Sequence, residues 1–257
     1  MGWDWWKLVR VFEKAVVRIV VEDAQLHDIE RPRSRATTSE RLRSDIDDFV
    51  REFRKSSRLL NLAENGKLSV ALVGRYLRSI HYLLRHTPIH LSRAEQRAQT
   101  LGHQDLAAYY AAKKTEETGH DRWAESDISL LSKTFGVIVS DDPTPAMISI
   151  VEANSRVIEE SPFHYLAYIL FAEYLMIVLG PEWIRALSEK CGVPASHMSA
   201  IGNHVELDKD HVEEGCAEID ALVATDQAEP LRIALRGMME RFSVFCDSLC
   251  DAGFAVA

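Results

Sequence analysis

One stretch limits the folds open to this chain more than any other: residues 162–180 read PFHYLAYILFAEYLMIVLG. A run this long and this apolar is typical either of a membrane span or of a helix buried inside a protein. Glu173 stands near its middle, and an ionisable carboxylate is costly at that depth in lipid. We therefore interpret the stretch as a buried core helix and predict no transmembrane segment.

The rest of the chain shows the periodicity of amphipathic helices, without the alternating runs that would form a set of strands. Residues 37–62 begin with a Thr/Ser cap followed by Glu40, which is a capping-box pattern. Pro88 predicts a kink or break, and Pro181 predicts the start of a short helix. We predict an all-α fold of seven to nine helices. The expected helices beyond residue 65 are 68 to past 85, 105–133, 146–160, 162–180, a short one from 181, one carrying 204–211, and 230–250.

Bulk composition narrows the class of protein. A formal net charge of −9 disfavours a nucleic-acid-binding protein, whose binding face should be basic. The four cysteines include no CxxC pair, so we interpret them as reduced and predict a cytoplasmic protein. The first twenty residues lack the uninterrupted apolar run of a signal peptide, and their three tryptophans favour a docking helix. We predict an N-terminal helical extension over residues 1–65, packed on a single globular domain over residues 66–257.

The segment HVELDKDH begins at residue 204 and contains a candidate metal-ligand pattern. On a helix, His204, Asp208 and His211 fall within roughly 60° of one another. Imidazole and carboxylate together suit zinc, iron or manganese. A solvated, charged helix face would show the same residues, so the pattern needs partners elsewhere in the chain.

Two other helices supply such partners. Glu117 and His120 lie three residues apart in the predicted 105–133 helix, with Glu116 on a neighbouring face. Glu173 is a buried carboxylate, which must be paired, protonated or bound to a metal; a salt bridge to arginine is the alternative. Six oxygen and nitrogen ligands without a cysteine suit two iron or manganese ions better than one structural zinc. The candidate metal ligands are Glu117, His120, Glu173, His204, Asp208 and His211.

Four blocks of the chain together resemble the heme-oxygenase-like diiron oxidases and oxygenases. In order they read RYLRSIHYLLRHTP, EETGHDRWAESD, SPFHYLAYILFAEYL and HVELDKDH, and the resemblance covers about residues 66–225. It implies a helical fold with a pair of non-heme irons held by the six ligands above. It also implies that Glu117 bridges the two irons, while Glu116 stands outside the ligand shell.

The chain departs from that family on the helix containing YLRSIHYLL. Family members usually carry a further glutamate there, whereas this chain has Ser79 and Ile80 at the expected point, followed by His81. His81 either replaces the carboxylate or is an ordinary core histidine. On the same helix, Arg78 and Arg85 could bind a substrate carboxylate bidentately, or could both be solvated.

The resemblance implies an iron-dependent oxidoreductase that uses O2 as co-substrate. Its expected substrate is a small amino-acid-like or carboxylate molecule in specialised, natural-product biosynthesis. We expect Fe(II)/Fe(III), two ions per chain with one held more weakly. An external electron donor and a homodimer are compatible with this class. Two alternatives stay open: a metal-free enzyme of the thiaminase or pyrroloquinoline-quinone-synthase type, and a noncatalytic helical binding protein.

Overall fold

The computed structural model describes residues 36–251, and these residues form helices without any strand. The prediction of an all-α fold is confirmed. The helices are α2 (Thr38–Ser56), α3 (Arg58–Glu64), α4 (Val70–Thr100), α5 (Gln104–Glu117), α6 (Asp121–Phe135), α7 (Pro145–Glu160), α8 (Pro162–Lys190), α9 (Ser199–Leu222) and α10 (Ala228–Asp251), with short 3-10 turns at Ala195–His197 and Thr225–Gln227.

Helix α8 is the apolar stretch that contains Glu173, and it lies in the core as predicted. It packs against α9, α10, α7, α2 and α3. Among the described residues it is the one helix long and apolar enough to cross a membrane, but 61% of that window is buried in the protein. Burial by neighbouring helices explains why the stretch is apolar on nearly all sides.

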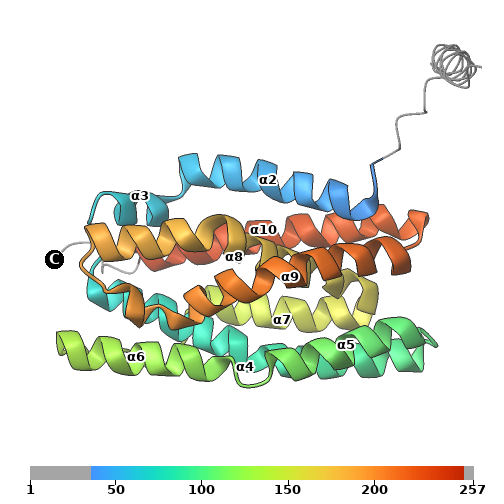
Figure 1. Ribbon diagram of the computed structural model, residues 1–257, viewed down its shortest axis with the longest axis horizontal. Helices are drawn as coiled ribbons and strands as arrows, with labels where there is room; N and C mark the ends of the chain where they lie inside the picture. Colours follow the sequence, from blue (N-terminus) through green and yellow to red (C-terminus); the bar gives the residue numbers. More distant parts are fainter. Residues whose placement is uncertain (1–35, 252–257) are drawn as a thin grey trace, which may run out of the picture. The chain divides into compact units, whose positions relative to one another are not determined.

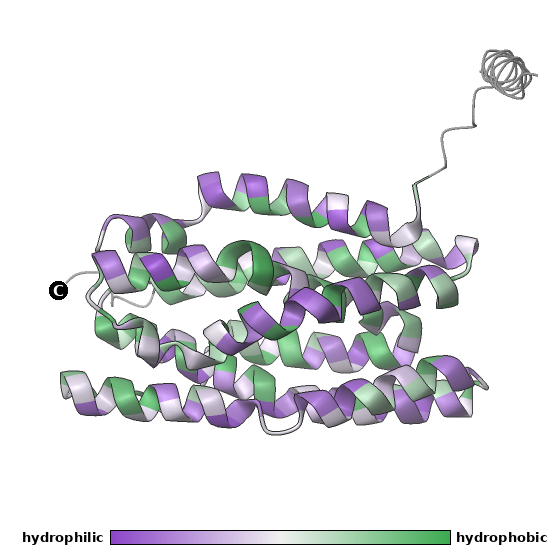
Figure 2. Ribbon diagram, in the orientation of Figure 1, coloured by the Kyte–Doolittle hydropathy of each residue, from purple (hydrophilic) through white to green (hydrophobic). Residues whose placement is uncertain are grey.

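Helices α2 and α3 cover one side of α8 and α10, and α5 and α6 follow one another along α4 (Figure 1). The predicted capping box at Thr37 and Glu40 starts α2, whose hydrophobic residues face the bundle and whose hydrophilic residues face outward (Figure 2). The tryptophan-rich segment and its predicted docking helix fall within residues 1–35, outside the described residues.

Three predicted helix boundaries were wrong. Residues 37–62 form two helices because Ser57 ends α2 and caps α3. The predicted 105–133 helix is broken between α5 and α6, where Gly119 has φ = 97°; glycine adopts this left-handed conformation without steric cost. Pro181 lies inside α8 rather than starting a new helix. The buried residues Trp183 and Leu187 anchor the part of α8 beyond it, so tertiary packing outweighs the local signal.

Helices α8 and α9 approach closely at Gly180, and this approach gives a testable expectation. A Cβ at Gly180 would lie 2.5 Å from Val205 Cγ2, on the residue that follows His204. We expect Gly180→Ala to lower the free energy of unfolding by about 1–3 kcal/mol through overpacking. Denaturant unfolding monitored by circular dichroism measures this change.

Gly202 on α9 provides the matched control for this substitution. A Cβ there would meet only Ile184 Cδ1 at 3.8 Å, which is ordinary van der Waals contact. Gly202→Ala should therefore leave stability unchanged or raise it by up to about 1 kcal/mol, because alanine favours helix over glycine. Equal effects of the two substitutions would mean that the α8–α9 contact is not tight at Gly180.

Candidate metal centre

The candidate centre forms where the α5–α6 junction meets α8 and α9. Glu117 is the last residue of α5 and His120 immediately precedes α6. Although the helix breaks between them, His120 Nδ1 lies 3.2 Å from Glu117 Oε2. The predicted pairing of the two side chains therefore occurs in the structure, but through a glycine turn rather than through a continuous helix face.

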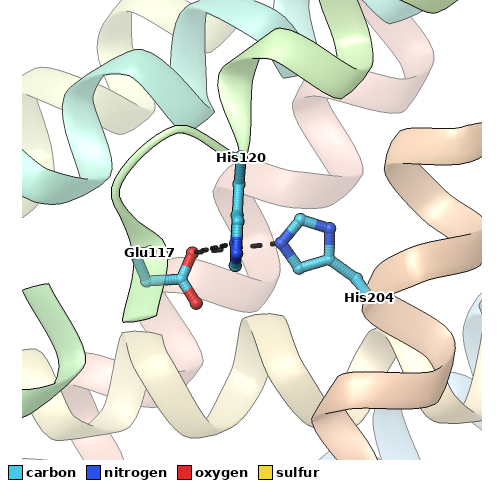
Figure 3. A group of neighbouring side chains, drawn as sticks. All are labelled: Glu117, His120 and His204. Carbon is cyan, nitrogen blue, oxygen red and sulfur yellow. Dashed lines mark hydrogen bonds and ion pairs between the residues drawn. The ribbon is translucent and has the colours of Figure 1, made fainter. Parts of the chain in front are cut away.

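Glu117, His120 and His204 form a first group of candidate ligands, in which one atom from each residue lies within 4.8 Å of the others. The three side chains point toward one another (Figure 3). His204 Nδ1 lies 2.6 Å from the carbonyl oxygen of Ala200. If Nδ1 carries the proton and donates it to that carbonyl, Nε2, which is 3.9 Å from Glu117 Oε2, has a lone pair for a metal.

Trp123 covers this first group. Its ring stacks on His120 with centroids 4.1 Å apart and an interplanar angle of 19°. It lies nearly perpendicular to the His204 ring, with centroids 5.5 Å apart. Rings held in this way keep a fixed orientation, which favours a preformed site over one that assembles on binding.

Glu117, Glu173 and His211 form a second group that meets the same distance criterion. His211 Nδ1 lies 3.8 Å from Glu173 Oε1 and 3.3 Å from Asp208 Oδ1. Asp208 belongs to neither group of mutually close atoms, but it is buried beside His211. Glu117 is the residue that the two groups share.

The carboxylates of the centre are in an environment that opposes their charge. Burial raises the pKa of Glu173 to about 7, even though the charge of Lys113 opposes this shift. Burial likewise raises the pKa of Asp208. Burial would also raise the pKa of Glu117, but hydrogen bonds from His120 and His204 hold it well below its usual range.

A buried oxygen atom of Glu173 indicates whether this environment fits a metal ion. Glu173 Oε2 is buried and has no hydrogen-bond partner among the described residues. A carboxylate oxygen left in this state is costly unless a cation completes its coordination. The oxygen and nitrogen donors, the shared Glu117 and this unpartnered oxygen together fit two ions of the iron or manganese type.

Lys113 is the residue of the centre that the sequence analysis missed. Its side chain is only 2% exposed, and its Nζ lies 3.2 Å from Glu173 Oε1 and 3.1 Å from Glu116 Oε2. Burial would lower the pKa of Lys113, but the charges of Glu173 and Glu116 outweigh it and hold the pKa above its usual value. The ion-pair alternative for Glu173 is thus present, although its partner is lysine rather than arginine. The sequence feature that could have identified Lys113 is its spacing, since it lies one helical turn before Glu117.

An apolar cavity of about 700 Å³ of empty space, counted to its opening, adjoins the candidate ligands. Helices α4 and α8 supply most of its wall. The apolar side chains and alanines that line it are Ile80, Leu83, Leu84, Leu91, Ile169, Ala172, Met176, Ala200 and Ile201.

The other predicted site residues, all on α4, belong to neither ligand group and do not line this cavity. Arg78 Nε and Nη2 donate to the Ser140 carbonyl and to Asp141. Arg85 is exposed. His81 joins neither group, and its Nδ1 lies 3.4 Å from Arg78 Nη1. These three residues thus belong to neither ligand group and do not line the cavity, and the roles expected for them from the sequence stay predictions.

The chain has the heme-oxygenase-like fold, which confirms the fold predicted from the sequence. A heme-oxygenase-like domain of unknown function from Shewanella denitrificans aligns with a TM-score of 0.72 and 18% identity, over 82% of this chain and 90% of that one. A TenA homolog from Pseudomonas syringae pv. tomato aligns with a TM-score of 0.63 and 14% identity, over 83% and 92%. A CADD-like protein of unknown function from Nostoc punctiforme aligns with a TM-score of 0.61 and 14% identity, over 83% and 100%.

No protein-family model matches the chain, and no curated protein matches it. The identities to the solved structures are low enough that these likenesses establish the fold alone. The fold class includes enzymes, but the chemistry of this chain has to be argued from its own residues.

Proposed function

We propose that this protein is a non-heme diiron enzyme that activates O2. The observation that carries the proposal is the shared Glu117, which links two overlapping groups of oxygen and nitrogen donors on α5–α6, α8 and α9. His120 and His204 would hold one ion with Glu117, and Glu173, His211 and Asp208 would hold the other. Two ferrous ions bound there would supply the electrons for the reduction of dioxygen.

The side chains around the ligands define what the protein itself contributes. The Ala200 carbonyl fixes the His204 ring, and Trp123 fixes the His120 ring, so both imidazoles are oriented before an ion arrives. The apolar wall supplied by α4 and α8 would disfavour water in the cavity and would hold the hydrocarbon part of a substrate beside the centre.

The side chains that line the cavity narrow the class of substrate that we propose. Apart from the candidate ligands, Lys113, Thr87 and Tyr168 are its only polar lining side chains among the described residues. A polar amino-acid side chain or backbone would leave several of its hydrogen-bonding groups unpaired there. Of the two substrate types expected from the sequence, we therefore favour a carboxylate with a hydrocarbon body over an amino-acid-like molecule.

The structure gives less support to the two alternatives, a metal-free enzyme and a noncatalytic binding protein. A metal-free enzyme of the thiaminase type would need a nucleophile, and no cysteine lines the cavity in the part of the chain that the structure describes. If the protein were a noncatalytic binding protein, nothing would explain why a buried Glu173 oxygen lacks a hydrogen-bond partner among the described residues. We therefore favour the metal-dependent enzyme.

The reaction with O2 tests this function. Protein loaded anaerobically with two equivalents of Fe(II) and then mixed with oxygenated buffer should consume O2 and show a transient visible absorption. His211→Ala should abolish both signals while leaving the far-ultraviolet circular dichroism unchanged, because the fold rests on apolar packing. His86→Ala is the matched control. Among the described residues, His86 Nδ1 bonds the Tyr82 carbonyl of its own helix, and this variant should react as the wild type does. Oxygen uptake by the His211 variant at the wild-type rate would remove the basis for the proposal.

A further inference from the structure

Lys113 Nζ is placed beside one of the two candidate metal positions and not beside the other. It lies within 3.2 Å of a Glu173 oxygen, and Glu173 belongs to the second group only. In the ion pairs of the described residues, Glu117 pairs with His120 and His204 and with no lysine or arginine. A positive charge is therefore already paired with a carboxylate of the second position, while no lysine or arginine of the described residues pairs with the first group.

A second ion at this position would meet that charge at short range. Two cations near one buried carboxylate repel each other strongly because water screens them poorly. The ion can bind Glu173 fully only when the ammonium group has moved away from it.

Glu116 offers the ammonium group a place to move to. Glu116 Oε2 already lies 3.1 Å from Lys113 Nζ, and the Glu116 side chain is 40% exposed. A small rotation of the lysine side chain would keep this ion pair while releasing Glu173. Lys113 would then sit nearer solvent, where a positive charge costs less.

We propose that Lys113 is an internal cation that holds Glu173 until a second metal ion displaces it, so that the two positions fill in order. The first ion binds at Glu117, His120 and His204, and the second binds at Glu173 and His211 only at higher concentration. The residue thereby sets how readily the mononuclear centre becomes dinuclear. This inference rests on the metal centre proposed above, but it predicts the order of filling, which the proposed function does not.

Titration with Mn(II) tests the order without O2 chemistry. In calorimetry the wild type should bind one Mn(II) tightly and a second at least about tenfold more weakly. Lys113→Met should tighten the second binding by about tenfold or more, so that the two affinities converge. Lys113→Arg keeps the charge and should preserve the wild-type gap.

Lys114→Met is the matched control, because Lys114 is the adjacent residue and pairs instead with Glu95 at 2.6 Å. It should titrate as the wild type does. Two equal affinities in the wild type, or an unchanged gap in Lys113→Met, would overturn the inference while leaving the metal centre in place. Absence of any Mn(II) binding to the folded wild type would overturn the metal centre as well.

Electron paramagnetic resonance of the wild type gives a reading that needs no variant, should Lys113→Met fail to fold. The first equivalent of Mn(II) should give the signal of an isolated ion, and spin-coupled signals should grow only with the second. Spin-coupled signals from the first equivalent onward would show that the positions fill together and that Lys113 does not order them.

Discussion

Glu117→Gln should strongly weaken metal binding at both positions of the centre. Glu117 is the residue common to the two ligand groups, and its Oε2 lies 3.2 Å from His120 Nδ1 and 3.9 Å from His204 Nε2. A neutral amide is a poor ligand for a hard or borderline divalent ion. We expect the affinity for Fe(II) to fall by about 100-fold or more, measured as iron retained after anaerobic loading and desalting.

Glu116→Gln is the control, because it alters the adjacent carboxylate on the exposed side of α5. It removes one partner of Lys113 but none of the ligands in either group. This variant should retain the iron of the first position, while the second position should weaken because Lys113 loses the partner to which it moves. Equal loss of iron in both variants would show that the charge of this turn matters rather than Glu117 itself.

Asp127→Ala should strongly destabilise the fold. Asp127 is 0% exposed, and its carboxylate accepts hydrogen bonds from Ser199 N at 2.9 Å, Ser199 Oγ at 2.6 Å and Ala200 N at 2.8 Å. These bonds satisfy the first amides of α9, which otherwise have no acceptor. Removing a buried charged acceptor should cost about 3–5 kcal/mol of unfolding free energy.

The same substitution should weaken metal binding, since Ala200 links Asp127 to the centre. Its amide is held by Asp127 and its carbonyl lies 2.6 Å from His204 Nδ1. Loss of an outer partner of a metal-ligating histidine typically lowers metal affinity by about 10- to 100-fold. Calorimetric titration of the folded variant with Mn(II) measures this effect separately from the stability loss.

Asp220→Ala provides a matched comparison near the other end of α9. Asp220 makes the same kind of bonds, accepting from Ser39 N at 2.8 Å and Ser39 Oγ at 2.6 Å, but it is exposed. Asp220→Ala should lower the free energy of unfolding by only about 1 kcal/mol and leave the metal affinity unchanged. If both aspartates had the same effect on metal affinity, the coupling of Asp127 to His204 would be wrong.

Much of the fold could be predicted because it depends on patterns that are local in sequence. The apolar run around Glu173 identified the core helix, and the capping box at Thr37 and Glu40 identified the start of α2. The glycine of EETGH also carried a local signal for the break between α5 and α6. The helical periodicity continues across this glycine, and the helix predicted from it was therefore too long.

The candidate centre could be predicted less completely than the fold. Periodicity shows which residues share a face of a helix, but not which residues of another helix approach that face. His204, Asp208 and His211 could be grouped by their spacing alone, and two of them contact the expected partners. Lys113 was not identified, because a lysine one turn from a glutamate is typical of a solvated helix. The spacing of Arg78 on α4 gave no indication that the loop after α6 would bind its guanidinium group.

Anomalous diffraction from crystals soaked anaerobically with Fe(II) tests most directly whether Glu117 lies between two metal ions. We predict two iron peaks about 3.5–4 Å apart, the spacing typical of two-metal sites. One peak should lie beside His120 and His204 and the other beside Glu173 and His211, with the Glu117 carboxylate between them. Well-ordered crystals without an iron peak at Glu117, at saturating Fe(II), would contradict the metal centre and the function proposed from it.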